Sequence, residues 1–266
     1  MPEPVGFFTD TSVCIGCKAC QVACHQWNAL PAEPGPNNGL PVLSGNSYDN
    51  TGSFSDVNWR HVKFIEFFST DLNRSEAAWL MMSDVCKHCV NAPCLEVCPT
   101  GALLRTEFDT VYINEPACNG CRDCVSACPF GVIHMSKDPS KLVAQKCTFC
   151  YDRLQHGMQP ACSQACPTQS IRFGPLQDLK KIADNRLAQL QKEGVAAARL
   201  YGADDKVLGG LNSFYLLLDK PETYGLPSKP KLPSRSVPWS SLWSVATACV
   251  TALGVLFAFR NRTRSS

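Results

Sequence analysis

Sixteen of the seventeen cysteines fall into four groups of four, and their spacing is the clearest chemical signal in this sequence. In every group two residues separate the first two thiols, and three residues separate the last two. A proline follows the fourth thiol in three of the groups. The groups span residues 14–24, 86–98, 118–128 and 147–166. Thiols this dense can form disulfides, bind zinc or bind iron–sulfur clusters.

Disulfides and zinc fit this spacing poorly. Thiols so close along the chain cannot all pair with neighbours without strain. The opening stretch MPEPVGFFTDTS has neither the basic nor the apolar segment of a signal peptide, so we expect no secreted disulfide framework. Zinc sites need two C-x-x-C pairs on a longer loop, which leaves the third thiol and the proline without a role. The pattern therefore favours iron–sulfur clusters.

The spacing also predicts which thiols share a cluster. In two-cluster ferredoxins, three thiols of one loop bind one cluster and the fourth thiol binds the other. Sixteen thiols at four per cluster predict four [4Fe–4S] clusters. Groups 86–98 and 118–128 are close enough to exchange fourth ligands, and symmetry pairs the first group with the last. The predicted ligand sets are site 1, Cys14, Cys17, Cys20 and Cys166; site 2, Cys24, Cys147, Cys150 and Cys162; site 3, Cys98, Cys118, Cys121 and Cys124; and site 4, Cys86, Cys89, Cys94 and Cys128.

Each cysteine group also has a cation beside it. A cluster on four thiolates is an anion, so a nearby positive charge would raise its reduction potential. A solvated surface charge is the equal alternative for each of these residues. The candidates for potential tuning are Lys18, Lys87, Arg122 and Lys146. We expect His25 and His88, which also adjoin cysteines, to be solvated or hydrogen-bonded rather than ligands.

Other functions lack a signature. The net charge of +2 and the lack of a dense basic run argue against a nucleic-acid surface. The sequence contains no C-x-x-C-H haem motif and no nucleotide-binding glycine fingerprint. We find no constellation for bond-breaking chemistry. The sequence therefore predicts an electron carrier with no catalytic residues of its own.

Secondary structure is expected around the cysteine groups. Residues 30–56 are rich in Pro, Gly, Asn and Ser and predict a surface loop, whereas the aromatic alternation of 57–69 predicts a strand. Residues 102–114 predict a β-hairpin that turns near Glu107–Asp109. A short strand is expected at 169–174. The apolar spacing of 176–193, between a proline and a glycine, predicts a helix.

The C-terminal part changes in composition. Residues 220–238 are rich in Pro and Lys and predict a linker after a cluster domain at 1–219. Residues 239–259 carry no charge and are long enough for a transmembrane helix, and 260–266 form a basic tail. The predicted fold class is α+β: two interleaved two-cluster ferredoxin-like modules with loop insertions, plus one C-terminal transmembrane helix. A buried helix of a soluble domain is the alternative for 239–259.

The motifs CIGCKACQVAC, CKHCVNAPCLEVCP, CNGCRDCVSACP and CTFCYDRLQHGMQPACSQACP resemble those of the four-cluster electron-transfer subunits of molybdoenzyme complexes. Together with WLMMSDVCKHC and the C-terminal helix, they are most similar to the β subunit of membrane-bound respiratory formate dehydrogenase. The resemblance covers about residues 8–260. It implies a catalytic α subunit with molybdenum or tungsten on a pyranopterin, a membrane cytochrome b γ subunit and a quinone acceptor in anaerobic respiration.

The resemblance also implies an arrangement of the clusters. It puts site 1 nearest the catalytic subunit and site 4 nearest the membrane haem. It implies export together with an α subunit that bears the signal, and the charges of the short basic tail favour a cluster domain on the periplasmic face of the inner membrane. The equivalent subunit of a membrane-bound nickel–iron hydrogenase, or of another molybdoenzyme oxidoreductase, remains the alternative. Several relatives run longer, which leaves a different catalytic or membrane partner open.

Overall fold

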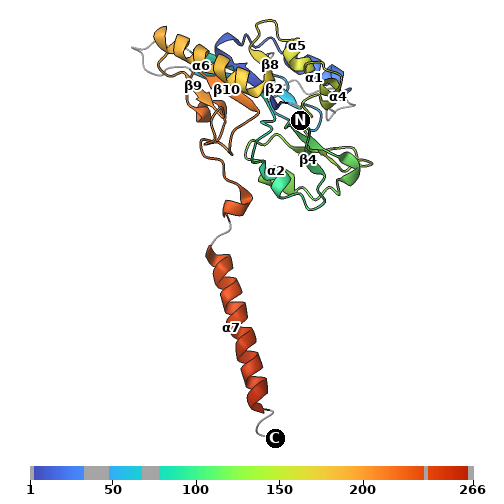
Figure 1. The fold of residues 1–266 in the computed structure, drawn as a ribbon. Helices are drawn as coiled ribbons and strands as arrows, with labels where there is room; N and C mark the ends of the chain where they lie inside the picture. The colour runs from blue at the N-terminus through green and yellow to red at the C-terminus, as the bar shows by residue number, and fades with distance from the viewer. Residues whose placement is uncertain (1–2, 33–47, 68–77, 237–238, 263–266) are drawn as a thin grey trace. The chain divides into compact units, whose positions relative to one another are not determined.

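The computed structural model describes residues 3–32, 48–67, 78–236 and 239–262 (Figure 1). Two compact units make up the chain, Met1–Lys231 and Leu232–Ser266. The first unit carries all four cysteine groups. The predicted loop at 30–56 lies partly outside the described residues.

A four-stranded sheet joins the beginning of the first unit to its end. Its strands lie in the order β8 (Ile171–Pro175), β1 (Val5–Asp10), β10 (Ser213–Leu217) and β9 (Arg199–Tyr201). Strands β1 and β10 are parallel, with Phe8 opposite Phe214, and the two outer pairs are antiparallel. All five residues of β10 are buried, so this sheet forms the core between distant parts of the chain.

Helix α6 (Leu176–Lys192) covers this sheet and contacts β1, β8 and β9. The helix predicted at 176–193 and the strand predicted at 169–174 are thereby confirmed. The helix buries Leu176, Leu179, Ala183 and Leu190. In Figure 1 it runs along the sheet on the side away from the lobe that contains α2 and β4.

The described residues also form three two-stranded antiparallel pairs: β2 (Arg60–Phe67) with β3 (Ala78–Val85), β4 (Leu103–Arg105) with β5 (Val111–Ile113), and β6 (His134–Met135) with β7 (Ala144–Gln145). The hairpin predicted at 102–114 is confirmed, and β2 lies within the strand predicted at 57–69. Asp109 takes a positive φ of 62° in the turn, where Arg105 holds its carboxylate at 2.9 Å.

Short helices accompany the cysteine groups: α1 (Ala19–Trp27), α2 (Pro93–Glu96), α3 (Asp123–Ala127), α4 (Tyr151–Gln155) and α5 (Ala161–Gln164). Helix α1 contacts α5, and α2 contacts α3. Each contact joins the two groups that were predicted to exchange their fourth thiols. The arrangement therefore has the form of two interleaved ferredoxin-like modules in a mixed α/β fold. Within the described ranges the chain also forms 3₁₀ turns at Thr11–Val13, Glu115–Ala117, Pro221–Tyr224 and Pro233–Ser236.

The first unit extends beyond residue 219, where the cluster domain was expected to end. Tyr224 and Leu226 are buried, and the Tyr201 hydroxyl donates to the Pro227 carbonyl at 2.6 Å. The aromatic and aliphatic side chains of the expected linker anchor it as far as Lys231.

Helix α7 (Trp239–Arg262) forms where the transmembrane helix was predicted, but the prediction of a membrane span is not supported. In the part of the chain that the structure describes, no helix combines the length and the apolar character that crossing a membrane requires. Hydroxyl side chains interrupt the apolar stretch, and Thr251 bonds back to the carbonyls of Thr247 and Ala248 at 3.0 and 2.9 Å.

Candidate cluster sites

Each cysteine group opens with a tight C-x-x-C loop whose third residue has a positive φ. These residues are Gly16 (65°), His88 (43°), Gly120 (74°) and Phe149 (64°). Left-handed backbone turns amide N–H groups toward the concave side of such a loop. In the fourth group the Phe149 N–H donates to the Cys147 sulfur at 3.3 Å. Glycine adopts this conformation freely, so His88 and Phe149 must be held in it by their surroundings.

Packing supplies that restraint. The Phe149 ring is fully buried, with its centroid 4.1 Å from that of Phe7 and 4.7 Å from that of His88. The His88 Nδ1 accepts a hydrogen bond from the Val111 N–H at 3.0 Å. The rings of these two strained residues therefore meet between the second and fourth cysteine groups. No feature of the sequence pattern indicated this contact.

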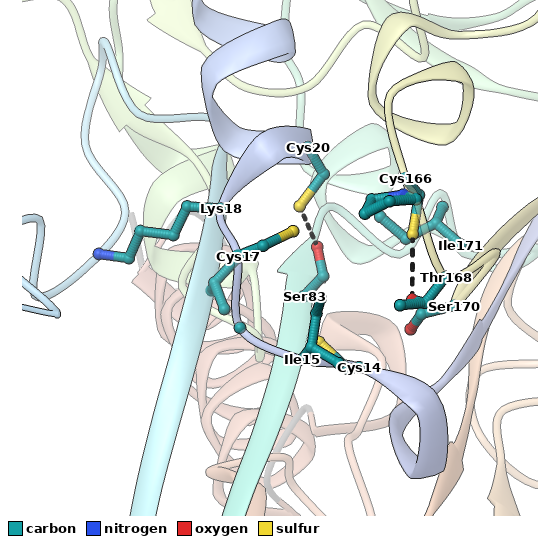
Figure 2. A pocket seen from close by; sticks show the side chains of 13 residues that line it. Cys14, Ile15, Cys17, Lys18, Cys20, Ser83, Cys166, Thr168, Ser170 and Ile171 are labelled. Atoms are coloured by element: carbon teal, nitrogen blue, oxygen red, sulfur yellow. Dashed lines mark hydrogen bonds between the residues drawn. The ribbon is translucent and has the colours of Figure 1, made fainter.

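The thiols of site 1 converge on one hollow (Figure 2). Cys14, Cys17, Cys20 and Cys166 all line this space. The Ser83 hydroxyl lies 3.1 Å from the Cys20 sulfur. Lys18 points away from the thiols and pairs with Asp49 at 3.3 Å.

The other predicted ligand sets are also brought together. Two further hollows are lined by the four thiols of site 3 and by the four thiols of site 4. At site 2 the pKa of Cys24 lies well above its usual value because of burial and then because of the charges of Cys147, Cys162 and Cys150. The hollows of sites 1, 3 and 4 thus each combine three thiols of one group with the fourth thiol of another.

A [4Fe–4S] cluster fits this donor set. Its four iron corners take one thiolate each, so the ligands surround a volume instead of a point. Within the described ranges, no group of three or more His, Cys, Asp or Glu side chains is arranged around a single metal ion. The roles of the sixteen thiols as ligands remain a prediction.

Burial controls the protonation of the inner thiols. It raises the pKa of Cys147 to about 12, and it raises that of Cys94 to about 12 although Lys146 acts in the opposite direction. Near the surface, partial burial raises the pKa of Cys98, but the N–H groups of Leu103 and Thr100 outweigh it and the net shift is downward. Iron binding at the buried thiols must therefore displace protons.

Interactions between residues of different sites show which cluster sites lie next to each other. The rings of His88, in the loop of site 4, and Phe149, in the loop of site 2, have centroids 4.7 Å apart, which makes these two sites neighbours, and the charge of Cys86 accordingly raises the pKa of Cys147 after burial. Cys162 contributes to the raised pKa of Cys20, after burial and against Arg60, and so links sites 1 and 2. Cys124 similarly acts on Cys94, which links sites 3 and 4.

The resulting order is site 1, site 2, site 4, site 3. Site 4 is therefore an inner site, contrary to the expectation that it lies at the membrane end of the series. Cys17 at site 1 and Cys121 at site 3 are exposed, whereas Cys86 and Cys147 are buried. The fourth-ligand exchange places Cys98, from the second group, at the surface end of the series.

The predicted tuning cations divide into two kinds. Lys87 and Lys146 are buried, and Lys87 pairs with the buried Asp84. The Lys146 ammonium donates to the carbonyls of Val111 and Cys147 at 2.6 and 2.9 Å. Lys18 and the exposed Arg122 occupy equivalent left-handed positions directly before α1 and α3. The influence of all four on cluster potentials remains a prediction.

Sequence reasoning missed Arg60, a fully buried arginine between sites 1 and 2. It lies far from every cysteine group along the chain. An arginine near the start of the strand predicted at 57–69 was the available signal. Of the two histidines, the His25 ring nitrogen lies 3.1 Å from the Pro31 carbonyl, and His88 is hydrogen-bonded as described above.

Comparison with known proteins agrees with this geometry. Two family models, each described as a 4Fe-4S dicluster domain, match residues 13–102 and 77–176. The chain is 37% identical over 254 residues to the nitrate-inducible formate dehydrogenase iron-sulfur subunit of Escherichia coli (strain K12), a match that covers 94% of the chain and 80% of the relative.

Two further relatives come from the same organism. The formate dehydrogenase-O iron-sulfur subunit is 35% identical, over 92% of this chain and 78% of its own length. The B subunit of the anaerobic dimethyl sulfoxide reductase is 32% identical, over 68% of this chain and 78% of its own length. Four [4Fe–4S] clusters account for sixteen of the seventeen cysteines.

Proposed function

Because this chain belongs to the family of formate dehydrogenase iron–sulfur subunits, we propose that it conducts electrons from a formate-oxidising catalytic subunit to a membrane cytochrome b that reduces quinone. The chain is an electron-transfer subunit of an oxidoreductase complex. The catalytic partner would hold molybdenum or tungsten on a pyranopterin. The proposal assigns the sixteen cysteines of sites 1 to 4 as the cluster ligands.

The continuous series of four thiol sites is the observation that supports this proposal. Two inner sites lie between two outer sites, and both outer sites have an exposed cysteine, Cys17 and Cys121. A series of this kind has one end for each partner. A bound [4Fe–4S] cluster takes up and releases one electron.

The residues of the chain hold and insulate these sites. The thiols fix the cluster positions, and the left-handed residues at Gly16 and Gly120 shape the outer loops. The rings of His88 and Phe149 fill the space between the inner sites and exclude water there. Low solvent access at inner sites reduces the solvent rearrangement that accompanies a change of charge.

Exposed apolar side chains beside the two outer sites suit protein partners. Ile15 follows Cys14 and is 58% exposed, and Leu142 is 60% exposed beside the Gly120 loop. Apolar residues at both ends of the series are typical of contact surfaces. We assign site 1 to the catalytic partner and site 3 to the cytochrome. We also assign the complex to the cytoplasmic membrane, with its clusters on the periplasmic face.

The decisive experiment is dye-linked activity of the complex that copurifies with this chain from mildly solubilised membranes under anaerobic conditions. Reduction of viologen by formate and not by hydrogen is expected. Activity with hydrogen alone would assign the chain to a nickel–iron hydrogenase, and activity with neither donor would point to another oxidoreductase.

The similarity to the dimethyl sulfoxide reductase subunit supports a second candidate, in which electrons run toward a reductase. Its signature would be oxidation of reduced viologen by a sulfoxide. The four-cluster path would be the same in both cases, with only its direction reversed.

A further inference from the structure

Arg60 lies on β2 with its side chain only 1% exposed, deep between sites 1 and 2. Its Nη1 donates to the Ser83 hydroxyl at 2.9 Å, and its guanidinium carbon lies 5.2 Å from the centroid of the Phe7 ring. Its Nε and Nη2 atoms have no hydrogen-bond partner among the described residues. Five N–H donors are thus buried with a single acceptor oxygen.

The charge of Arg60 has no carboxylate counter-ion within the described part of the chain. A buried guanidinium is strongly unfavourable without a compensating negative charge. Lys18 and Lys87 differ, since they pair with Asp49 and Asp84. The compensating charge of Arg60 must therefore come from another source.

Thiols of two cluster sites act electrostatically on the guanidinium. Burial alone would lower the pKa of Arg60, but thiolate charge at Cys162, Cys20, Cys147 and Cys24 outweighs it. Of these, Cys20 belongs to site 1 and the others belong to site 2. The Ser83 hydroxyl connects Arg60 to Cys20, because it accepts from the guanidinium and lies 3.1 Å from the Cys20 sulfur.

We propose that Arg60 is the shared counter-charge of the clusters at sites 1 and 2 and keeps their reduction potentials higher than those clusters would have without it. The inference rests on the ligand sets of the proposed function. A cluster on four thiolates is already an anion and becomes more negative by one charge when it accepts an electron. A fixed positive charge therefore favours the reduced form. No proton accompanies the electron at Arg60, because arginine stays protonated.

The test compares Arg60→Gln with the wild-type chain in its complex, prepared anaerobically and titrated with dithionite while the clusters are followed by electron paramagnetic resonance. The signals of sites 1 and 2 are identified by their loss in Cys17→Ala and Cys150→Ala variants. In Arg60→Gln we expect the reduction potentials of the clusters at sites 1 and 2 to fall by at least about 59 mV. For a one-electron step, this is a tenfold weaker reduction equilibrium. The signals of sites 3 and 4 should stay in place.

Two further variants control for charge and for folding. Arg199→Gln removes the same charge from β9, where the Arg199 side chain donates to the Ala197 carbonyl at 3.0 Å, and should shift no signal. Arg60→Lys keeps the charge and should have potentials close to those of the wild type. If Arg60→Gln loses iron, recovery of full iron content and near-wild-type potentials in Arg60→Lys supports the proposal.

Unmoved signals, equal shifts at all four sites, or an Arg60→Lys variant as impaired as Arg60→Gln would overturn the role of Arg60. The four-cluster assignment is tested separately, by the presence of four one-electron signals in the wild-type chain. A failure of the Arg60 proposal is therefore distinguishable from a failure of the proposed function.

Discussion

The outer and inner cluster sites are built from C-x-x-C loops that differ in the residue at the left-handed position. The outer loops, at sites 1 and 3, have glycine at the left-handed position and expose a cysteine to solvent. The inner loops, at sites 2 and 4, have Phe149 and His88 there, and their rings pack against each other. The comparison shows that one backbone shape serves two purposes. Glycine keeps the loop small at the exposed outer sites, and an aromatic or imidazole ring fills the space between the inner sites.

The largest effect is expected from removing a cysteine that serves as the fourth ligand of a cluster built mainly by another cysteine group. Cys128→Ser should remove the cluster at inner site 4 and leave the cluster of its own sequence neighbours at site 3, because Cys128 lines the hollow of site 4. Iron content and electron paramagnetic resonance measure the loss. Cys249→Ser, an exposed thiol on α7, is the matched control and should retain all iron. Loss of the site 3 signal would refute the exchange.

Chelation under mild oxidation should separate the two kinds of site by rate. Iron should leave sites 1 and 3 first, because Cys17 and Cys121 are exposed, and should leave the buried sites 2 and 4 later. About half of the iron is then released in a fast phase. Iron release and the resonance signals are followed together over time. A single phase, or early loss of the inner signals, would contradict the comparison.

The inner region should also be the more sensitive to loss of a charge. Asp84 is 1% exposed and lies between Lys87 and Lys63, with the Tyr215 hydroxyl donating to it at 3.1 Å. Asp84→Asn leaves a buried ammonium unpaired and should lower the free energy of unfolding by about 3–5 kcal/mol. Urea denaturation measures this. Asp178→Asn, in an exposed pair with Lys181, should change little.

The same carboxylate makes stability depend on pH. Burial raises the pKa of Asp84, but the charges of Lys87 and Lys63 outweigh it and hold that pKa well below its usual value. The stabilisation is therefore present at neutral pH and is lost as the pH falls below about 4, the unfolded value. In Asp84→Asn this part of the acid dependence should disappear from the denaturation curves.

The smallest effect concerns the glycine loops. At Gly120 (φ 74°) an added Cβ would lie 2.6 Å from the Leu142 carbonyl oxygen, so Gly120→Ala adds a backbone clash to the conformational strain. We expect a loss of about 1–3 kcal/mol in unfolding free energy. Gly194→Ala (φ 91°), with open space around it, isolates the strain. Equal losses in the two variants would show that the clash is relieved.

Local sequence patterns correctly predicted the secondary-structure elements that depend on residues close together along the chain. The hairpin at 102–114, the strand at 169–174 and helix α6 follow from turn residues and apolar spacing. The convergence of each thiol set follows from ligand chemistry. The order of the sites could not be predicted, because it depends on which side chains meet in space. The resemblance therefore placed site 4 at an end, whereas the His88 ring of site 4 packs against the Phe149 ring of site 2.

Tertiary contacts also account for the other omissions. Arg60 acquires its surroundings only when β2 packs beside thiols from α1 and α5, and no spacing rule connects these segments. The parallel pairing of β1 with β10 is equally remote in sequence. At His88 and Phe149 the left-handed backbone contradicts residue preference, and only the ring contact explains it.

The parallel pairing of β1 with β10 has a consequence for the order in which the protein is completed. Sites 3 and 4 draw all their thiols from residues 86–128 and can close while later segments are still being synthesised. Sites 1 and 2 need thiols on both sides of that block, and the sheet that fixes their loops is finished only when β10 joins β1. We therefore expect metal loading of the newly made chain to begin at sites 3 and 4 and to end at sites 1 and 2, so that site 1, which we assign to the catalytic partner, is completed last.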